Sequence, residues 1–383
     1  MVRKSDSQDH KETKTEVIPC SKDRKTSVVY LIPHLGNCGP VTQLFSLLNC
    51  IDSARFDCHV LTLFSERNNS MLEEFGKLGI SISSLALSKK NILSVHGRLK
   101  HALKVLEPDI IHSESVITDI LLLNNNYSSV VITTAHNYPF EDLRLRYGKS
   151  VGTILAMLEI RSMKKMNRII PCSNIIAKKY ERIIDRSKIT VIQNGLCKPD
   201  ICVKKDEARE KLGFDKHEIL FVSTGAFIKR KQPELIIKAF ELAQISNARL
   251  IMLGDGELLN KCIRSVYGNN ILFMGRVNDP FPYLVASDIF VSLSVSEGLP
   301  YGVMEAGMLD LRMILSDIPE HREIADEIGN IEEWVDLSQD VNAVANCLKR
   351  SAGSKKEYTY NMNTFSASEM AKKYEKIYMN IVG

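Results

Sequence analysis

The stretch "DIFVSLSVSEGLPYGVMEAGMLD", residues 288–310, decides the fold of the second half of the chain. It begins with a continuous apolar run, which is typical of a strand covered on both faces. Gly298 and Pro300 then form a turn, and "YGVMEAGMLD" continues as a helix whose first turn tolerates proline. A strand, a short turn and a helix in this order predict one unit of a parallel, doubly wound sheet.

Two glutamates, Glu297 and Glu305, flank this turn. The free N–H groups and the positive dipole end of the helix form a site suited to phosphate. Glu305 lies about one turn into the helix, on the same face as Tyr301. The arrangement suits a nucleotide-linked sugar, with phosphates at the amides and hydroxyl groups at the carboxylates. On spacing alone, a helix cap at Glu297 with an exposed Glu305 is an equally good interpretation.

Three further loops of this half also follow predicted strands. They are "STGAFIKRKQ" (223–232), "LGDGE" (253–257) and the polar loop "SDIPEHREI" (316–324). Each by itself is compatible with an ordinary solvated turn. Because the carboxyl ends of parallel strands meet at one edge of a sheet, we expect all four loops to line one ligand site.

The first two of these loops have residues suited to a nucleotide. Gly225 ends a strand and is followed by cations that can neutralise a diphosphate leaving group. These cations are Lys229, Arg230 and Lys231. Gly254 and Gly256 suit the close approach of a ribose or a flat ring to the backbone.

Strands and helices also alternate in the first half of the chain. Its continuous β-branched runs lie at 27–36, 56–64, 80–87, 109–114 and 129–137. Two consecutive series of this kind predict an α/β fold with two Rossmann-like, doubly wound domains that face a central cleft. A length of 383 residues also exceeds one ordinary core.

The expected organisation has five parts. They are a flexible polar tail (1–26), an N-terminal domain (27–198), a polar linker (199–216), a C-terminal domain (217–365) and an amphipathic C-terminal helix (366–383).

Composition excludes several classes of protein. With 44% hydrophobic and 25% charged residues, the sequence is neither disordered nor fibrous. No run approaches the roughly 18–20 apolar residues of a spanning helix, and the polar N-terminus lacks the apolar centre of a signal peptide. The nine cysteines have no CxxC spacing, which fits a reducing compartment and argues against a zinc site. We therefore expect a cytosolic protein.

The net charge of +4 conceals an asymmetry. Residues 1–200 contain 28 Lys and Arg against 20 Asp and Glu, whereas residues 201–383 contain 22 against 26. The first half is thus expected to meet an anionic partner, and nucleic acid, an anionic membrane surface and an anionic substrate all fit.

Basic residues concentrate at 144–188, with 12 Lys and Arg against three acids. Four of them recur at helical spacing, near the apolar residues of 154–158, and predict a basic stripe on one helix. The four are Arg161, Lys164, Lys165 and Arg168. The stripe is either a solvated face or a surface for anionic lipid at the inner face of a cell membrane. Nucleic acid is disfavoured because no aromatic residues interleave with the cations.

The second half resembles the donor-binding domain of the family 4 glycosyltransferases, which are retaining enzymes of the two-domain GT-B type. Their Glu-x7-Glu motif is matched by Glu297 and Glu305, and the other donor loops occur in the expected order. In the first half, "LGNCGPVTQ" (35–43) resembles the glycine-rich loop after the first strand, and "TTAHN" (133–137) the loop with a histidine. The resemblance covers roughly residues 27–380.

The resemblance implies roles for these residues. Glu305 would bind the donor ribose, Glu297 would contact the transferred sugar near its reacting carbon, and Lys231 would bind the diphosphate. The backbone around Leu299, Tyr301 and Gly302 would hold phosphate or sugar oxygens. The family usually has arginine directly after the donor-loop glycine. Ala226 occupies that position here, so Lys229 or Arg230 is expected to supply the charge.

In the N-terminal domain, the resemblance implies an acceptor side. Gly36, Gly39 and Pro40 form the loop that opens a helix at the cleft, although a structural turn is an equal alternative from the residues alone. A lone histidine at a strand end, such as His136, is more often a hydrogen-bonded residue than a catalyst. The family places a histidine of this loop close to the sugar, which makes His136 a candidate catalytic residue.

The sequence therefore predicts a retaining glycosyltransferase. It is expected to move a sugar from a nucleotide-diphosphate sugar, with UDP favoured, to a saccharide acceptor, which is expected to be lipid-linked. The nucleotide sugar is a substrate, and neither a cofactor nor a metal is expected because the helix dipole and the cations stabilise the leaving diphosphate. The alternatives are a non-catalytic sugar-nucleotide-binding protein, an epimerase or a glycosyl phosphorylase on the same scaffold.

Overall fold

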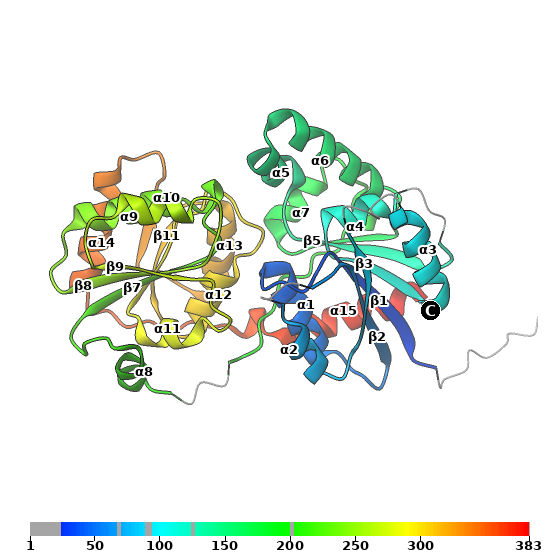
Figure 1. Ribbon diagram of the computed structural model, residues 1–383, viewed down its shortest axis with the longest axis horizontal. Coiled ribbons are helices and arrows are strands. Elements are labelled where there is room, and N and C mark those ends of the chain that lie inside the picture. The colour runs from blue at the N-terminus through cyan, green and yellow to red at the C-terminus, as the bar shows by residue number, and fades with distance from the viewer. Residues whose placement is uncertain (1–23, 67–69, 89–93, 124–126, 200–202, 383) are drawn as a thin grey trace, which may run out of the picture.

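The structure is a computed structural model that describes residues 24–66, 70–88, 94–123, 127–199 and 203–382. These residues form two α/β domains that lie side by side (Figure 1), and each domain is built on a six-stranded parallel sheet. The expected fold class is confirmed. Most of the expected N-terminal tail lies outside the described residues.

The sheet of the first domain has the strand order β3-β2-β1-β4-β5-β6. The strands are β1 (Thr26–Ile32), β2 (Phe56–Phe64), β3 (Ser81–Leu87), β4 (Ile110–Ser113), β5 (Val130–Ala135) and β6 (Arg168–Pro171). The helices are α1 (Gly39–Cys50), α2 (Leu72–Lys77), α3 (Val95–Leu106), α4 (Val116–Leu121), α5 (Pro139–Tyr147), α6 (Lys149–Met163) and α7 (Asn174–Tyr180).

The alternating side chains of β1 show why both faces of this sheet need helices. Val28 and Tyr30 pack in the cluster that contains α1, whereas Val29 and Leu31 pack in the cluster that contains α3 and α6. All four side chains are buried, which explains the unbroken apolar run in the sequence.

The second domain repeats this plan with the strand order β12-β11-β10-β7-β8-β9. The strands are β7 (Ile219–Thr224), β8 (Ala248–Leu253), β9 (Ile271–Gly275), β10 (Ile289–Ser292), β11 (Arg312–Ser316) and β12 (Glu333–Val335). The helices are α8 (Lys205–Leu212), α9 (Pro233–Ala243), α10 (Leu259–Ser265), α11 (Phe281–Ala286), α12 (Tyr301–Met308), α13 (Pro319–Ile328) and α14 (Val341–Gly353).

The region expected to be a linker, residues 199–216, contains helix α8, so that prediction was wrong for 205–212. Arg209 is buried and donates from Nη2 to Asp288 at 2.7 Å and from Nε to the Ala286 carbonyl at 2.8 Å. This ion pair fixes α8 to the second domain. The highly charged sequence did not reveal this ion pair, because a sequence does not show which arginine has a buried partner.

The loop "SDIPEHREI" also differs from the prediction, because most of it is the first turns of α13. Pro319 is the first residue of that helix, and its missing N–H group is not needed there. Only Asp317 and Ile318 separate β11 from α13.

The last helix, α15 (Ala367–Val382), returns to the first domain and completes its core. Tyr374 and Tyr378 are fully buried there, between α15 and the sheet. The Tyr378 hydroxyl lies 2.8 Å from His112 Nδ1 and 3.0 Å from the Tyr30 hydroxyl. Two polar contacts in an apolar core thus fix the position of α15.

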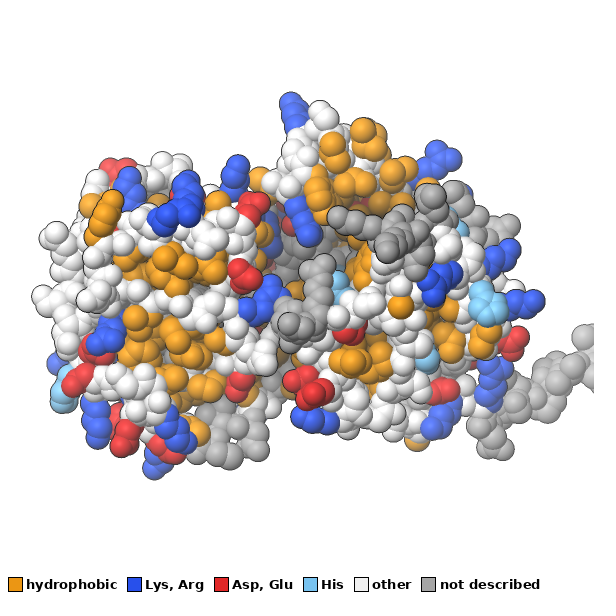
Figure 2. Space-filling view, in the orientation of Figure 1, with side chains coloured by type: hydrophobic (Ala, Val, Ile, Leu, Met, Phe, Trp, Pro, Cys, Tyr) orange, Lys and Arg blue, Asp and Glu red, His pale blue; other side chains and the backbone are white. Residues whose placement is uncertain are grey.

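The described part of the chain has no helix that is both long enough and apolar enough to span a bilayer. Apolar side chains nevertheless gather on the surface over α5 and α6 (Figure 2).

We predict that Tyr378→Phe destabilises the protein by about 1–3 kcal/mol, because it removes a partner from two buried polar groups, His112 Nδ1 and the Tyr30 hydroxyl. Urea unfolding at constant pH measures this change. The control is Met379→Ala, since the neighbouring Met379 is 43% exposed on the same helix. Equal unfolding midpoints for Tyr378→Phe and the wild type would contradict the structural role of this hydroxyl.

Candidate active site

Four loops of the second domain meet at one edge of its sheet. Strands β11, β10, β7 and β8 are consecutive neighbours and pair in parallel. The loops after these strands therefore share the carboxyl edge, as the sequence indicated. They are 317–318, 293–300, 225–232 and 254–258.

Lys231 lies over the glycine turn that follows β7. It ends a short 3-10 helix, Lys229–Lys231, and a Cβ added at Gly225 would lie 3.5 Å from its Cε. Gly225 itself has φ +142°, a conformation that favours glycine. The turn therefore presents the ammonium group of Lys231 at the sheet edge.

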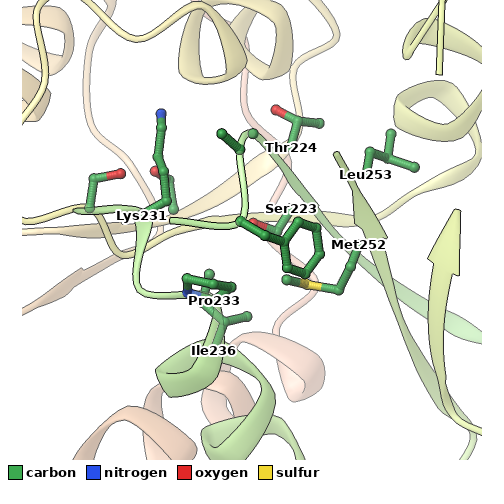
Figure 3. Close-up of a pocket in the computed structure, with 12 residues that line it drawn as sticks. Ser223, Thr224, Lys231, Pro233, Ile236, Met252 and Leu253 are labelled. Carbon is green, nitrogen blue, oxygen red and sulfur yellow. The ribbon is translucent and has the colours of Figure 1, made fainter. Parts of the chain in front are cut away.

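A small pocket lies beside this turn (Figure 3) and is lined from the ends of β7, β8 and β10. Pro233, Ile236 and Met252 lie on the apolar side of the pocket, while the amine of Lys231 and the hydroxyl of Thr224 point the opposite way. The polar groups thus face the open edge of the sheet.

Glu297 is buried between two cations, with only 6% of its surface exposed. Arg230 Nη1 donates to one carboxylate oxygen at 2.6 Å, and Lys231 Nζ donates to the other. Burial alone would raise the pKa of Glu297, but the charges of Lys231 and Arg230 outweigh it and hold the pKa well below its usual range. Glu297 is therefore ionised and holds both cations in place.

Arg230 also connects the loop after β7 to its neighbours. Its Nη1 donates to the Ser296 carbonyl at 2.7 Å, and its Nε lies 3.6 Å from Asp142 of the first domain. Only 13% of its side chain is exposed. Arg230 is thus engaged by protein groups and Lys229 is exposed, while Lys231 lies over Gly225, the residue before Ala226.

Glu305 differs from Glu297 in its surroundings. It is partly exposed on α12, and desolvation raises its pKa to about 7. The charge of Asp279 raises the pKa further, while Lys231 lowers it. A carboxyl group in this position is suited to hydrogen bonds with the hydroxyl groups of a ligand.

The two glycines of "LGDGE" lie where the loops after β7 and β8 pack against each other. A Cβ at Gly254 would lie 1.9 Å from the Gly225 carbonyl oxygen, and one at Gly256 would lie 2.6 Å from the Phe227 carbonyl oxygen. The two glycines thus permit contact between the backbones of neighbouring loops. The expectation that they also make room for a ribose or a flat ring stays a prediction.

The turn between Glu297 and α12 touches the first domain. A Cβ at Gly298 would lie 1.8 Å from the His136 carbonyl oxygen, so only glycine fits between the two loops. Leu299 is buried, and a Cβ at Gly302 would lie 2.4 Å from Thr224 Oγ1. These close approaches place the start of α12 between the two domains.

Tyr301 also faces the first domain. Its hydroxyl donates to the Gly195 carbonyl at 3.4 Å, and its ring lies 3.8 Å from the position of a Cβ at Gly39. Burial raises the pKa of this phenol well above its usual range. Tyr301 is thus an interdomain contact, which the sequence did not reveal.

The glycine-rich loop after β1 lies at the same interface. Gly39 and Pro40 are the first residues of α1, and Gly36 follows a bend in which its N–H donates to His34 Nδ1 at 3.0 Å. Arg276 of the second domain donates to the Asn37 carbonyl at 3.2 Å. The structure therefore brings the predicted acceptor loop to the interface between the two domains.

His136 ends β5 and is held by a residue that sequence reasoning missed. Its Nε2 lies 2.9 Å from Oε2 of Glu114, whose side chain is wholly buried at the end of β4. A carboxylate only accepts hydrogen bonds, so the ring of His136 donates from Nε2 to Glu114. The signal available in the sequence was an acidic residue directly after the apolar strand "DIIHS".

A polar chain leads from this pair to α15. Thr134 Oγ1 lies 3.4 Å from Glu114 Oε1, 2.8 Å from His112 Nε2 and 3.0 Å from the Tyr374 hydroxyl. Burial lowers the pKa of His112 to about 4, so this second imidazole is neutral. The orientation of His136 therefore depends on the core contacts of the C-terminal helix.

Two family profiles match the chain. The profile described as glycosyl transferases group 1 matches residues 204–346, and that described as glycosyltransferase family 4 matches residues 38–197. The chain belongs to the family 4, group 1 glycosyltransferases.

Two relatives of this glycosyltransferase come from Escherichia coli. The O-antigen biosynthesis glycosyltransferase WclY is 25% identical over 367 residues, which cover 92% of this chain and 98% of WclY. The UDP-Gal:alpha-D-GlcNAc-diphosphoundecaprenol alpha-1,3-galactosyltransferase is 31% identical over 255 residues, which cover 61% of this chain and 63% of that enzyme.

Solved structures share the two-domain GT-B fold. Anabaena HepE in complex with UDP and glucose has a TM-score of 0.72 at 12% identity and covers 93% of this chain and 100% of its own. WaaG, a glycosyltransferase involved in lipopolysaccharide biosynthesis, has a TM-score of 0.68 at 14% identity with the same coverage.

The predicted basic stripe is not a stripe on one helix of the glycosyltransferase. Helix α6 ends at Met163, so only Arg161 lies within it, and Arg168 opens β6. Arg168 Nη1 donates to the Ser187 carbonyl, and Lys165 Nζ donates to the Leu123 carbonyl at 3.1 Å. The helical spacing misled because the chain turns between Lys164 and Arg168.

Among the described residues, no group of three or more His, Cys, Asp or Glu side chains is placed to hold a metal ion. The expectation that the glycosyltransferase needs no cofactor stays a prediction.

We predict that Glu114→Gln lowers kcat about tenfold and changes the KM for the donor much less. The amide keeps the volume but loses the charge that fixes the proton and the ring of His136. Initial rates of sugar transfer at several pH values measure this, and the pH profile of kcat is expected to shift. Glu159→Gln is the matched control, because Glu159 is another buried carboxyl of the same domain, on α6. A Glu114→Gln variant with wild-type kcat and pH profile would show that this pair only stabilises the fold.

Proposed function

We propose that this glycosyltransferase moves a sugar from a UDP-sugar, with retention of configuration, to a saccharide carried on a lipid diphosphate. This reaction would be one step in the biosynthesis of a surface polysaccharide. The observation that carries the proposal is the convergence of Lys231, Glu305 and the start of α12 at one sheet edge, opposite His136. The names of the two Escherichia coli relatives support the donor, the acceptor and the pathway class.

In this proposal the donor lies along the carboxyl edge of β7 and β10. Glu305 accepts hydrogen bonds from the ribose, and Lys231 with the first-turn amides of α12 binds the diphosphate. Glu297 keeps Lys231 and Arg230 in position, because its carboxylate is bonded to both. His136 lies across the cleft, beside the sugar.

The chemical step breaks the bond between C1 of the sugar and the diphosphate oxygen, and the electron pair stays on that oxygen. The acceptor hydroxyl forms its bond to C1 on the same face, and its proton passes to the departing diphosphate. The configuration at C1 is therefore retained. Lys231 and the helix dipole stabilise the developing negative charge, which is the work a metal would otherwise do.

The first test measures transfer by mass spectrometry, with UDP-sugars offered to a lipid-diphosphate GlcNAc acceptor. We expect Glu305→Ala to weaken UDP-sugar binding roughly 10–100-fold, since it removes charged hydrogen bonds. Glu297→Ala is expected to lower kcat about 100-fold, because the cations at the diphosphate lose their support. EDTA is expected to change neither rate nor affinity.

The exposed Glu210→Ala on α8 is the control and is expected to behave as the wild type. Thermal unfolding of each variant separates loss of folding from loss of function. Wild-type transfer rates in both site variants would overturn the proposed site. Donor binding without any transfer would favour a non-catalytic binding protein.

The raised pKa of Glu305 gives a second prediction. Below pH 7 the carboxyl group is mainly protonated, and above pH 7 it is ionised and accepts stronger hydrogen bonds from a ribose. Affinity for UDP-glucose should therefore rise between pH 6 and pH 8, as calorimetry can measure. UDP-glucose is the suitable probe because its diphosphate diester does not titrate in this range. Glu305→Gln should remove the rise, and a rise that persists in this variant would assign it to another group.

A further inference from the structure

Helices α5 and α6 form a hairpin whose outer face is unusually apolar for a solvated surface. Six large apolar side chains of this hairpin are exposed, and we call them the α5–α6 outer face. They are Leu145 (48%), Tyr147 (46%), Val151 (53%), Ile154 (59%), Met157 (59%) and Leu158 (36%). Figure 2 shows hydrophobic side chains gathered over these two helices.

The helical geometry makes this face continuous. Val151, Ile154, Met157 and Leu158 recur at spacings of three and four residues, so they form one stripe along α6. Arg161 continues the same stripe by one turn and is exposed. The buried residues of α6, including Ala156 and Ile160, lie away from this stripe, and α6 packs against α4 and α5.

The surroundings of the α5–α6 outer face are cationic. Six exposed basic residues belong to the same segment, namely Arg144, Arg146, Lys149, Arg161, Lys164 and Lys165. The only acidic residue between 143 and 167 is Glu159, which is 4% exposed. Glu159 is therefore not part of the exposed surface, and desolvation raises its pKa well above its usual range, which favours the uncharged form. Apolar groups among uncompensated cations are typical of surfaces that bind anionic lipid.

The inner side of the hairpin belongs to the active site. Helix α5 begins at Pro139, directly after the loop with His136. Its Asp142 lies 3.6 Å from Arg230, and its Glu141 pairs with Lys179, which also pairs with Glu320 of the second domain. A surface bound by the outer face would therefore lie next to the cleft.

We propose that the α5–α6 outer face docks the glycosyltransferase on an anionic lipid bilayer. The apolar side chains would enter the boundary between headgroups and acyl chains, and the cations would lie at the lipid phosphates. A second copy of the chain fits poorly, because a twofold contact would bring the cations of one copy against those of the other. The choice of a bilayer rests on the lipid-linked acceptor of the proposed function.

Flotation of the purified full-length chain with vesicles tests this docking without any sugar. Vesicles of phosphatidylcholine with an equal part of phosphatidylglycerol should carry the protein, and pure phosphatidylcholine vesicles should carry much less. The double variant Ile154→Asp/Met157→Asp should reduce the bound fraction at least tenfold. Val105→Asp is the matched control, because Val105 is 69% exposed on α3 of the same domain. It should bind as the wild type does.

Binding of UDP-glucose separates this inference from the proposed function. The double variant should keep wild-type affinity for UDP-glucose, which also shows that it folds, and should lose transfer only to acceptors embedded in vesicles. Vesicle binding without transfer would uphold the docking face and overturn the proposed acceptor. Absence of vesicle binding by the wild type, or unchanged binding by the double variant, would overturn the docking face. The docking face would also be overturned if the wild type formed a dimer that does not bind vesicles and if the double variant were a monomer.

Discussion

The ion cluster around Glu297 is the interaction on which the site depends. A carboxylate with 6% exposure is stable only because Arg230 and Lys231 both bind it. These ion pairs connect the loop after β7 to the loop after β10. Arg230 also lies near Asp142, so the ion cluster reaches the first domain. One buried charge therefore fixes two strand-end loops and the position of Lys231, the cation that we propose binds the diphosphate.

A second polar network, in the first domain, also connects segments that are distant in the sequence. Glu114, Thr134 and His112 link His136 to the tyrosines of α15, although α15 is the last segment of the chain. Buried polar groups of this kind specify one arrangement, because each unsatisfied partner carries a desolvation cost. The C-terminal helix therefore contributes specific polar contacts as well as apolar packing.

Much of this architecture follows from patterns in the sequence. Continuous apolar runs such as 289–295 predicted the strands, and their alternation with helices predicted which loops share an edge. The pair Glu297 and Glu305 indicated a candidate donor site because its spacing is local. Contacts between distant segments were not predictable in this way. Neither Gly298 against the His136 carbonyl nor Arg209 against Asp288 leaves a local pattern, and the apparent stripe of cations broke where α6 ends.

The interface between the two domains combines close packing with exposed polar contacts. The two chain crossings lie side by side, since Leu196 N–H donates to Phe365 O at 2.8 Å and Ala367 N–H donates to Leu196 O at 3.1 Å. Away from this pair, Gly298 packs against the His136 carbonyl, and Tyr301 contacts Gly195. Other interdomain contacts join exposed polar groups, such as Asn37 with Asn278 and Glu323 with Asn174. Water can satisfy such groups equally well, so these contacts add little free energy to the closed arrangement. The paired crossings and the close contacts of Gly298 and Tyr301 therefore do more than the exposed polar groups to hold the two domains together.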